Sequence, residues 1–470
     1  MAGVTSYDVV IIGAGFAGLS AAVRLTQSGA RVLVLEARAR LGGRATAFQD
    51  RETGETVDNG QHILVGCYHD TFAFLDTIGA AANVRVQPQL AVTMIDRSGR
   101  ASRLAIPALP PPIHLLAGVF DWDVLSWRDR LSLLGMLRPL QNAQRELRGD
   151  GSAKAASPGE TVENWLIRNG QTPRLREMLW TPLALAALNQ HPGRAAAPPF
   201  ARVLAEMFGP EPRAAALALP IRPLHEMYAE PAREYIESRG GRVAAGVMAK
   251  VSTHGERVGD VLGGNERWSP HAVISAVPWF ALRDLFDDVP KALSGIVADA
   301  DRMAASPIVT VNLWFDRPVL DEPFVGLPGR VMQWAFNKTA LFTPGPEDPA
   351  DNRRPEEPVH TRDERWLVSL VSSGADAILR AANEELIATA HGELLDAIPR
   401  VRDARLLRAT VVREPRATFS LAPGQPARPV TETPLRGFLL AGDWIDTGLP
   451  ATIESAVRSG HRAAAHLRSA

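Results

Sequence analysis

The chain has 470 residues, which is enough for two domains with separate hydrophobic cores. Its 51 lysines and arginines nearly balance its 52 aspartates and glutamates, which removes the broad electrostatic argument for a nucleic acid partner. A single cysteine, Cys67, excludes a framework of internal disulfides and fits a reducing compartment.

The first 36 residues predict a βαβ unit. "YDVVIIGAG" is a short β-branched run that ends in glycine, "AGLSAAVRLTQSG" predicts a helix that stops at Gly29, and "RVLVLEA" predicts a second strand. The run carries Asp8 and lacks a basic region, so we do not interpret it as a secretory signal. We therefore expect a cytoplasmic protein.

The motif "GAGFAG" lies at the turn from this strand into the helix. Gly13 permits a tight turn, Gly15 lets the main chain approach a pyrophosphate, and Gly18 lets the helix pack close to the strand. Glu36 stands at the tip of the next strand, where a carboxylate can accept both hydroxyls of a ribose. The motif thus predicts dinucleotide binding, and the alternative is a glycine-rich turn in another α/β fold.

The middle of the chain changes character several times. Residues 130–219 are rich in Ala, Leu, Met and Trp and predict helices, whereas "GGRVAAGVMAKVSTHGERVGDVL" and "HAVISAVP" predict strands. Two further runs, "SPIVTVNLWFDRPV" and "ERWLVSLVSSGAD", predict strands of a second sheet, and residues 343–364 predict an exposed, mobile loop. The end of the chain predicts a strand, a glycine-bearing turn and a long helix.

Two further features of the sequence carry a resemblance to a known superfamily. Six residues after Glu36 comes "GGRATAF", and the far C-terminus reads "LLAGDWIDTGLPATIESAVRSG". Together they resemble the FAD-binding signature of the flavin amine oxidase and phytoene desaturase superfamily. The resemblance implies FAD as cofactor, with Asp443 near its ribityl or pyrophosphate region, the backbone at Thr452 and Ile453 facing the flavin ring, and Val247 or Met248 touching the adenine.

The resemblance also implies an α/β fold. A Rossmann-type FAD-binding domain would be interleaved with an amine oxidase-like substrate domain of mixed sheet and helices. The expected FAD-binding domain comprises residues 1–80, 225–290 and 410–470, and the expected substrate domain comprises residues 81–224 and 291–409. The expected cofactor contacts are Gly13, Gly15, Phe16, Ala17, Gly18, Glu36, Ala37, Arg38, Gly43, Arg44, Gly60, Gln61, His62, Ile63, Val247, Met248, Gly442, Asp443, Thr452 and Ile453.

The stretch "VDNGQHILVGCYHDTF" follows the second glycine motif. "DNGQHILVG" looks like the variant found in hydroxysqualene dehydroxylases, and the C-terminal segment is similar to that group too. The resemblance implies that Gly60 lets the main chain pass close to the isoalloxazine and that Gln61 and His62, the candidate catalytic residues, lie at its reactive face. Ile63 would begin an apolar wall.

Other interpretations of this stretch remain open. His62 and His69 are seven residues apart with no second cluster nearby, so we expect no metal site. Cys67 has no base in an adjacent motif, and we expect it to pack. Asp58 is expected to cap a turn or to anchor Arg44. His62 is either a proton donor in catalysis or an orienting residue.

The substrate end is apolar. The proline-rich run "LAIPALPPPIHLLAGVF" cannot span a membrane as a regular helix. With Trp122, Trp127 and Trp180 it suits either a helical core or a mouth that rests on a membrane and admits a long isoprenoid. No separate NAD(P)H motif is present, so an external reductant for FAD is expected.

The family resemblance implies a reductive removal of the allylic hydroxyl of hydroxysqualene. Three alternatives remain open: a carotenoid-type desaturase or isomerase, a flavin amine oxidase, and a flavin-holding scaffold without turnover. The absence of a cysteine near the C-terminus argues against covalent flavin attachment and, weakly, against amines.

Overall fold

The computed structural model describes residues 6–107, 109, 113–150, 153–211, 213–342 and 365–469. The loop predicted at residues 343–364 therefore lies outside the described residues. Within the described ranges, no helix has both the length and the apolar character that crossing a membrane requires.

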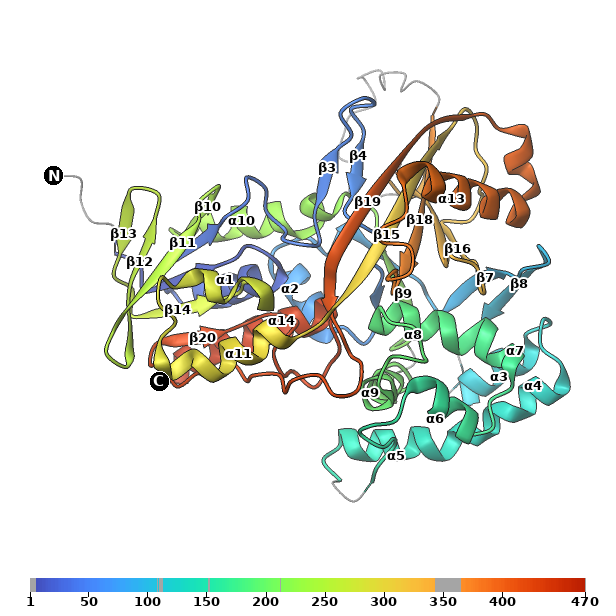
Figure 1. Ribbon diagram of the computed structural model, residues 1–470, viewed down its shortest axis with the longest axis horizontal. Coiled ribbons are helices and arrows are strands. Elements are labelled where there is room, and N and C mark those ends of the chain that lie inside the picture. Colours follow the sequence, from blue (N-terminus) through green and yellow to red (C-terminus); the bar gives the residue numbers. More distant parts are fainter. Residues whose placement is uncertain are drawn as a thin grey trace.

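A five-stranded parallel sheet lies at the left of Figure 1. Helix α1 (Phe16–Gln27) connects its first two strands, which confirms the predicted βαβ unit. The order across this sheet is β10 (Arg242–Ala245), β2 (Val32–Glu36), β1 (Val9–Ile12), β14 (Ala272–Ser275) and β20 (Phe438–Leu440).

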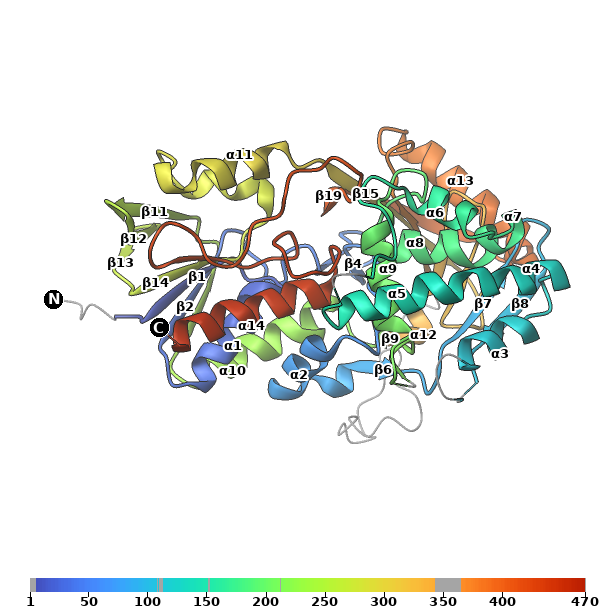
Figure 2. The same ribbon diagram turned by 90° about the horizontal axis from the view of Figure 1, so that it is seen from below.

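The strands β1 and β2 are buried on both faces, as a continuous apolar run predicts. Alternate side chains point to opposite sides, so Val9 and Ile11 share one core with α1, α10 (Glu230–Glu237) and α14 (Ile453–Ser469). Val10 and Ile12 belong to the other core. Figure 2 shows these three helices on one side of the sheet.

The opposite side carries an antiparallel sheet and a helix (Figure 2). The sheet comprises β11 (Ala249–His254), β12 (Arg257–Gly263) and β13 (Glu266–Trp268), and the helix is α11 (Ser294–Arg302).

A seven-stranded mixed sheet forms the second half of the molecule, at the upper right of Figure 1. Helix α13 (Asn383–Ala397) packs against it through Leu386, Ala390 and Leu394. Its strand order is β19 (Leu406–Phe419), β15 (Ala305–Phe315), β18 (Trp366–Ser373), β17 (Trp334–Asn337), β16 (Phe324–Gly326), β7 (Ala91–Ile95) and β8 (Ala101–Ala105).

The helical segment predicted for residues 130–219 forms a lobe at the lower right of Figure 1. Its helices are α3 (Ile113–Asp121), α4 (Trp127–Ser132), α5 (Leu137–Leu147), α6 (Val162–Arg168), α7 (Pro173–Leu175), α8 (Thr181–Leu188) and α9 (Ala197–Met207). The remaining elements are β3 (Ala47–Gln49), β4 (Thr56–Asp58), β5 (Leu64–Val65), α2 (His69–Thr77), β6 (Val84–Val86), β9 (Leu217–Pro220) and α12 (Lys338–Phe342).

The predicted fold class is confirmed: a Rossmann-type parallel sheet alternates along the chain with a mixed sheet and a helical lobe. The domain boundaries stay a prediction. The boundary between residues 409 and 410 falls inside β19, which continues to Phe419 as part of the mixed sheet.

The closing helix α14 crosses α1 at very close range. Gly460 allows this approach, because a Cβ atom there would collide with the carbonyl oxygen of Ala17 and the hydroxyl of Ser20. The Ser20 hydroxyl also lies 3.4 Å from the carbonyl oxygen of Val457, to which it donates. Small residues therefore hold the last helix of the chain against the first.

We predict that Gly460→Ala destabilises the protein, because overpacking a close helix crossing typically costs about 1–3 kcal/mol. The measurement is the thermal midpoint of unfolding with and without added FAD. Gly295→Ala in α11 is the matched control, since nothing lies within 4 Å of a Cβ atom there. An unchanged midpoint for Gly460→Ala would contradict the steric role.

Candidate functional site

The turn between β1 and α1 forms a cradle without side chains. A Cβ atom at Gly13 would lie 2.7 Å from the carbonyl oxygen of Ala276, so this position requires glycine. Gly15 faces Gly43 across open space, because a Cβ atom at Gly15 would find its nearest neighbour, the Gly43 Cα, 4.0 Å away. Helix α1 has no side-chain cap, which leaves N–H donors for an anion.

Glu36 is buried at the edge of this cradle. One of its oxygens accepts from the main-chain N–H of Ala14 at 2.9 Å and the other from that of Arg38 at 2.9 Å. Both carboxylate oxygens are thus fixed beside the turn, while Ala37 and Arg38 are exposed. The position suits the ribose contact that the sequence predicts.

Arg44 lies where the N-terminal and C-terminal segments meet. Its guanidinium donates to Asp443 at 2.5 Å and to the carbonyl oxygen of Ala417 at 2.8 Å. The expectation that Asp58 anchors Arg44 is therefore wrong, because the acidic partner of Arg44 comes from residue 443. The pair places one cation and one anion together beside the glycine cradle, as binding of a pyrophosphate and ribityl chain would use.

Tyr228 contacts both parts of the glycine cradle, and no motif in the sequence indicates this role. Its ring stacks on Phe16 with centroids 3.5 Å apart, and its hydroxyl donates to the carbonyl oxygen of Gly42 at 2.9 Å. Burial raises the pKa of this phenol, so the hydroxyl stays a donor.

The two adenine candidates differ in what their main chains already do. The N–H of Val247 donates to the carbonyl oxygen of Glu36 at 2.8 Å and is not available to a ligand. Among the described residues, the Met248 main chain has no hydrogen-bond partner, and its side chain is exposed. Met248 is therefore the better placed of the two for adenine.

The C-terminal segment presents a helix start to the site. The N–H of Gly442 donates to the hydroxyl of Ser459, and the hydroxyl of Thr452 accepts from the N–H of Ser455. Ile453 begins α14, whose N-terminal dipole favours negative charge. The predicted contacts at Gly442, Thr452 and Ile453 are thus brought to one end of one helix.

A charged cluster fastens α14 to α2. Glu454 is buried and accepts from the N–H groups of Asp70 and Thr71 at 3.0 and 2.9 Å. Asp70 in turn accepts from Arg458 at 3.0 Å and lies 2.8 Å from His461. His461 and Arg458 together lower the pKa of Asp70 to about 2, which means that the carboxylate is stabilised in its charged form.

The loop from Asp58 to Ile63 is held by a residue that the sequence analysis missed. The ammonium group of Lys338, 1% exposed, donates to Asp58 at 2.5 Å and to Gln61 at 2.6 Å. Asp58 also accepts from the N–H of Leu224 at 3.0 Å, so its side chain joins segments 166 residues apart and, among the described residues, makes no bond within its own turn. The chain has four lysines, at 154, 250, 291 and 338, and Lys338 directly follows a buried strand, which is the one signal that could have found it.

His62 is the most unusual polar group of the loop. Its Nδ1 atom is buried and has no partner among the described residues. Its pKa is lowered, first because burial disfavours the charged form and further by the nearby cations Lys338 and Arg44, although Asp58 opposes this. The ring is therefore neutral at neutral pH.

Two other candidates from the sequence were a nucleophilic cysteine and a metal site. Cys67 is buried, and burial raises its pKa to about 12, so the thiol stays protonated and is a poor nucleophile. Within the described ranges, no group of three histidine, cysteine or acidic side chains is arranged to hold a metal.

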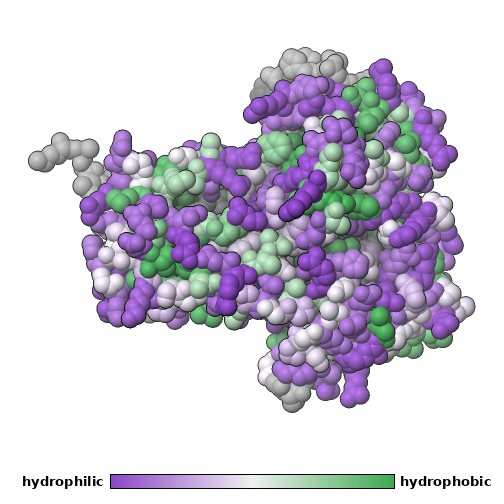
Figure 3. Space-filling view, in the orientation of Figure 1, coloured by the Kyte–Doolittle hydropathy of each residue, from purple (hydrophilic) through white to green (hydrophobic). Residues whose placement is uncertain are grey.

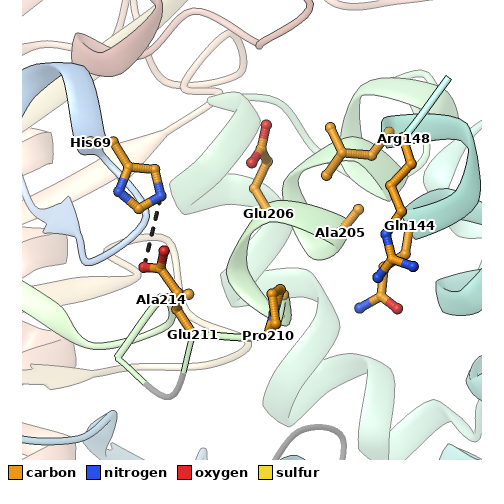
Figure 4. A pocket seen from close by; sticks show the side chains of 10 residues that line it. His69, Gln144, Arg148, Ala205, Glu206, Pro210, Glu211 and Ala214 are labelled. Atoms are coloured by element: carbon orange, nitrogen blue, oxygen red, sulfur yellow. Dashed lines mark ion pairs between the residues drawn. The ribbon is translucent and has the colours of Figure 1, made fainter.

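His69 lies apart from the flavin residues, in a hollow of about 110 Å³ between α2, α5 and α9 (Figure 4). Its imidazole lies 3.9 Å from the carboxylate of Glu211. The hollow is also lined by Gln144, Arg148 and Glu206, and none of the predicted flavin contacts borders it. These charged walls do not suit an apolar ligand.

Comparisons with known proteins agree with this geometry. A family model described as flavin containing amine oxidoreductase matches residues 16–468. Hydroxysqualene dehydroxylase of Rhodopseudomonas palustris is 31% identical over 98% of this chain and 98% of its own length. A 15-cis-phytoene desaturase of an Oncidium hybrid cultivar is 26% identical over 96% of this chain and 76% of its own length.

Two solved structures support the fold alone. An oxidoreductase from Methanosarcina mazei has a TM-score of 0.69 at 16% identity, and covers 97% of this chain and 99% of its own. Putrescine oxidase bound to putrescine has a TM-score of 0.67 at 17% identity, with 99% of each chain covered.

We predict that Glu36→Ala weakens FAD binding roughly tenfold or more, because hydrogen bonds to a charged acceptor are worth about 1.5–3 kcal/mol. The measurement is the Kd of the apoprotein for FAD, followed by quenching of flavin fluorescence. Glu266→Ala, at an exposed glutamate of β13, is the matched control and should leave Kd unchanged. Equal Kd values for both variants would show that Glu36 does not hold the ribose.

A second prediction concerns acid stability. Because the folded-state pKa of Asp70 is lowered to about 2 from 3.8, its contribution is complete above pH 4 and disappears as the pH falls toward 2. Asp70→Asn should therefore lower the free energy of unfolding at pH 6 by about 1–2 kcal/mol, allowing for the partial exposure of the carboxylate. The difference from wild type should shrink at pH 3.

The measurement is urea unfolding at both pH values. Asp76→Asn, at an exposed aspartate of the same helix, is the control. A deficit in Asp70→Asn that does not change with pH would show that its charge is not the cause.

Proposed function

Because this chain belongs to the flavin containing amine oxidoreductases and is an FAD-dependent oxidoreductase, we propose that it removes the allylic hydroxyl of hydroxysqualene to form squalene. The observation that carries the proposal is the unpartnered, buried Nδ1 of His62 in the "DNGQH" loop, in a chain similar along its whole length to a hydroxysqualene dehydroxylase. That loop would place a proton-carrying group beside the flavin.

The residues present fit FAD. The side-chain-free cradle at Gly15 and Gly43 suits the pyrophosphate, Glu36 suits the ribose, and the start of α14 suits the negatively charged edge of the flavin ring. When bound and reduced, FAD supplies the hydride that replaces the departing hydroxyl group.

His62 would deliver the proton that this reaction consumes. Protonation lets the hydroxyl leave as water, and the hydride then completes the new C–H bond, so one alcohol, one proton and one hydride give one alkene product and water. The lowered pKa of His62 makes its protonated form scarce at neutral pH but a stronger acid than free histidine. Gln61 would orient the loop that carries it.

The residues that follow His62 favour an apolar substrate. An allylic cation survives only where water is excluded, and Ile63 and Val65 pack half-buried against the main hydrophobic core beside the loop. The reductant for FAD is proposed to come from outside the chain, as a separate reductase or as free reduced flavin.

The helical lobe offers an entrance for a long apolar chain. Large apolar side chains lie exposed on α3, α4 and the turn that follows, at Ile113, Trp127, Leu131 and Leu134. In the same lobe a small hollow of about 20 Å³ is lined by Leu115, Leu116, Leu133, Met136, Leu137, Leu140, Trp180, Leu204 and Phe208. We propose that this region contacts a membrane surface and admits the isoprenoid.

The three tryptophans noted in the sequence differ in burial, and so differ in whether they fit a helical core or a membrane-contacting mouth. Trp122 and Trp180 are buried in the core of the lobe, and only Trp127 is exposed, at 67%. The face of the molecule seen in Figure 3 is largely hydrophilic, with its apolar side chains in separate patches. A membrane contact through this face would therefore be local.

A carotenoid-type desaturase is the second candidate, because 15-cis-phytoene desaturases also match along most of this chain. That enzyme would use oxidised FAD and would need no proton donor. An amine oxidase or a scaffold without turnover is not favoured by a specific observation in the site.

The test is anaerobic. Reduced enzyme is mixed with hydroxysqualene, flavin reoxidation is followed near 450 nm and the lipid is extracted for squalene. We expect reoxidation with an equal amount of squalene, and a rate roughly 100-fold lower in His62→Ala, because general acid catalysis typically contributes that much.

Two outcomes would count against the proposal. A flavin that stays reduced, with no squalene formed, would exclude the dehydroxylation and turn attention to oxidised enzyme with other polyisoprenoids. Near-normal reoxidation in His62→Ala would leave the reaction standing but remove His62 as the donor. His466→Ala, at the far end of α14, is the matched histidine control.

A further inference from the structure

We propose that Lys338 is a positioning residue of the flavin site, which orients Gln61 and His62 and, with Asp58, sets the charge felt by the cofactor. The part of this inference that concerns His62 rests on the proposed function. The part that concerns charge depends on FAD binding alone.

The ammonium group of Lys338 uses all three of its protons. Two donate to Asp58 and Gln61, at 2.5 and 2.6 Å, and the third side of the group lies 4.0 Å from the centre of the Phe342 ring. Asp58 is also buried. An ion pair withdrawn from water in this way is costly unless its geometry is complete, and here it is complete.

Lys338 decides which way the Gln61 amide points. Because an ammonium group can only donate, Gln61 must turn its oxygen toward Lys338, and its nitrogen then donates to the carbonyl oxygen of His62 at 3.2 Å. The main chain of His62 is thereby fixed. A chain of two hydrogen bonds that starts at Lys338 thus anchors the main chain from which the imidazole of His62 projects.

The loop is continuous with the residues expected to hold FAD. Asn59, next to Asp58, donates to the carbonyl oxygen of Arg44 at 2.9 Å, and Arg44 pairs with Asp443. A Cβ atom at Gly60 would lie 3.8 Å from the hydroxyl of Thr310 in β15. Lys338, which directly follows β17, and Thr310 of β15 therefore bring the second half of the molecule against this loop.

A neutral pair of opposite charges exerts little net field, but either charge alone would act on the flavin. A reduced flavin carries more negative charge than an oxidised one, so an unpaired cation nearby favours reduction and an unpaired anion opposes it. Lys338→Met leaves the carboxylate alone and should lower the two-electron reduction potential. Asp58→Asn leaves the ammonium alone and should raise it.

The experiment measures the reduction potential of FAD in the holoprotein by equilibration with a reference dye. Lys338→Met is compared with wild type at pH 8 and Asp58→Asn at pH 6, because a higher pH favours the ionised form of a carboxyl group and a lower pH favours the charged form of an amine. Shifts of opposite sign support the proposal. Lys154→Met, at an exposed lysine paired with Glu146, is the matched control and should show no shift.

If Lys338 and Asp58 only stabilised the fold, their two variants would not shift the reduction potential of FAD in opposite directions. Shifts of the same sign, or none in either variant, would overturn the proposal. Should Lys338→Met fail to fold, Asp58→Asn at pH 6 and Lys338→Arg decide the matter, since the arginine variant should keep the wild-type potential.

The positioning of His62 has its own test. Lys338→Met should slow flavin reoxidation by hydroxysqualene at least tenfold with little change in KM, and adding Gln61→Ala should slow it no further. Additive losses would show that Lys338 does not act through Gln61. If wild type itself forms no squalene, the proposed function fails while the potentials still test Lys338.

Discussion

The close contact between the first and last helices of the chain is the constraint on which the proposed flavin site depends. Gly460 lets α14 approach the Ala17 carbonyl of α1, and this brings residues 442–453 beside a cradle made by residues 13–18. Neither segment forms a site alone: the glycine turn offers donors for a pyrophosphate, and the start of α14 offers a positive helix end for a flavin edge. The contact therefore controls the geometry of the whole cofactor site.

Two ion pairs near the site join segments that are far apart in the chain. Arg44 meets Asp443, and Lys338 meets Asp58. Such pairs add little net stability, because desolvation offsets most of their attraction. Their effect is one of specificity: a shifted arrangement would leave a buried charge without its partner, which is strongly unfavourable.

Local signals were sufficient to predict the elements that carry the cofactor. The β-branched run before "GAGFAG", the glycine spacing and Glu36 lie within 36 residues, and each is placed in the structure as expected. Lys338 could not be found in this way, because its partners lie some 280 residues earlier in the chain and no motif surrounds it. The acidic partner of Arg44 could not be found locally either, because Asp443 lies 399 residues later in the chain.

The two candidate reactions place different demands on the loop that carries His62. A desaturation gives up a hydride to oxidised FAD and needs a dry, shaped pocket but no acid. A dehydroxylation needs both dryness and a proton, and these conflict, because the burial that excludes water also lowers the pKa of an imidazole. The nearby carboxylate of Asp58 opposes that lowering, whereas Lys338 adds to it and neutralises the carboxylate. The loop must therefore exclude water and still let His62 hold a proton. The buried pair of Lys338 and Asp58 influences the pKa of His62 and so affects how far both conditions are met.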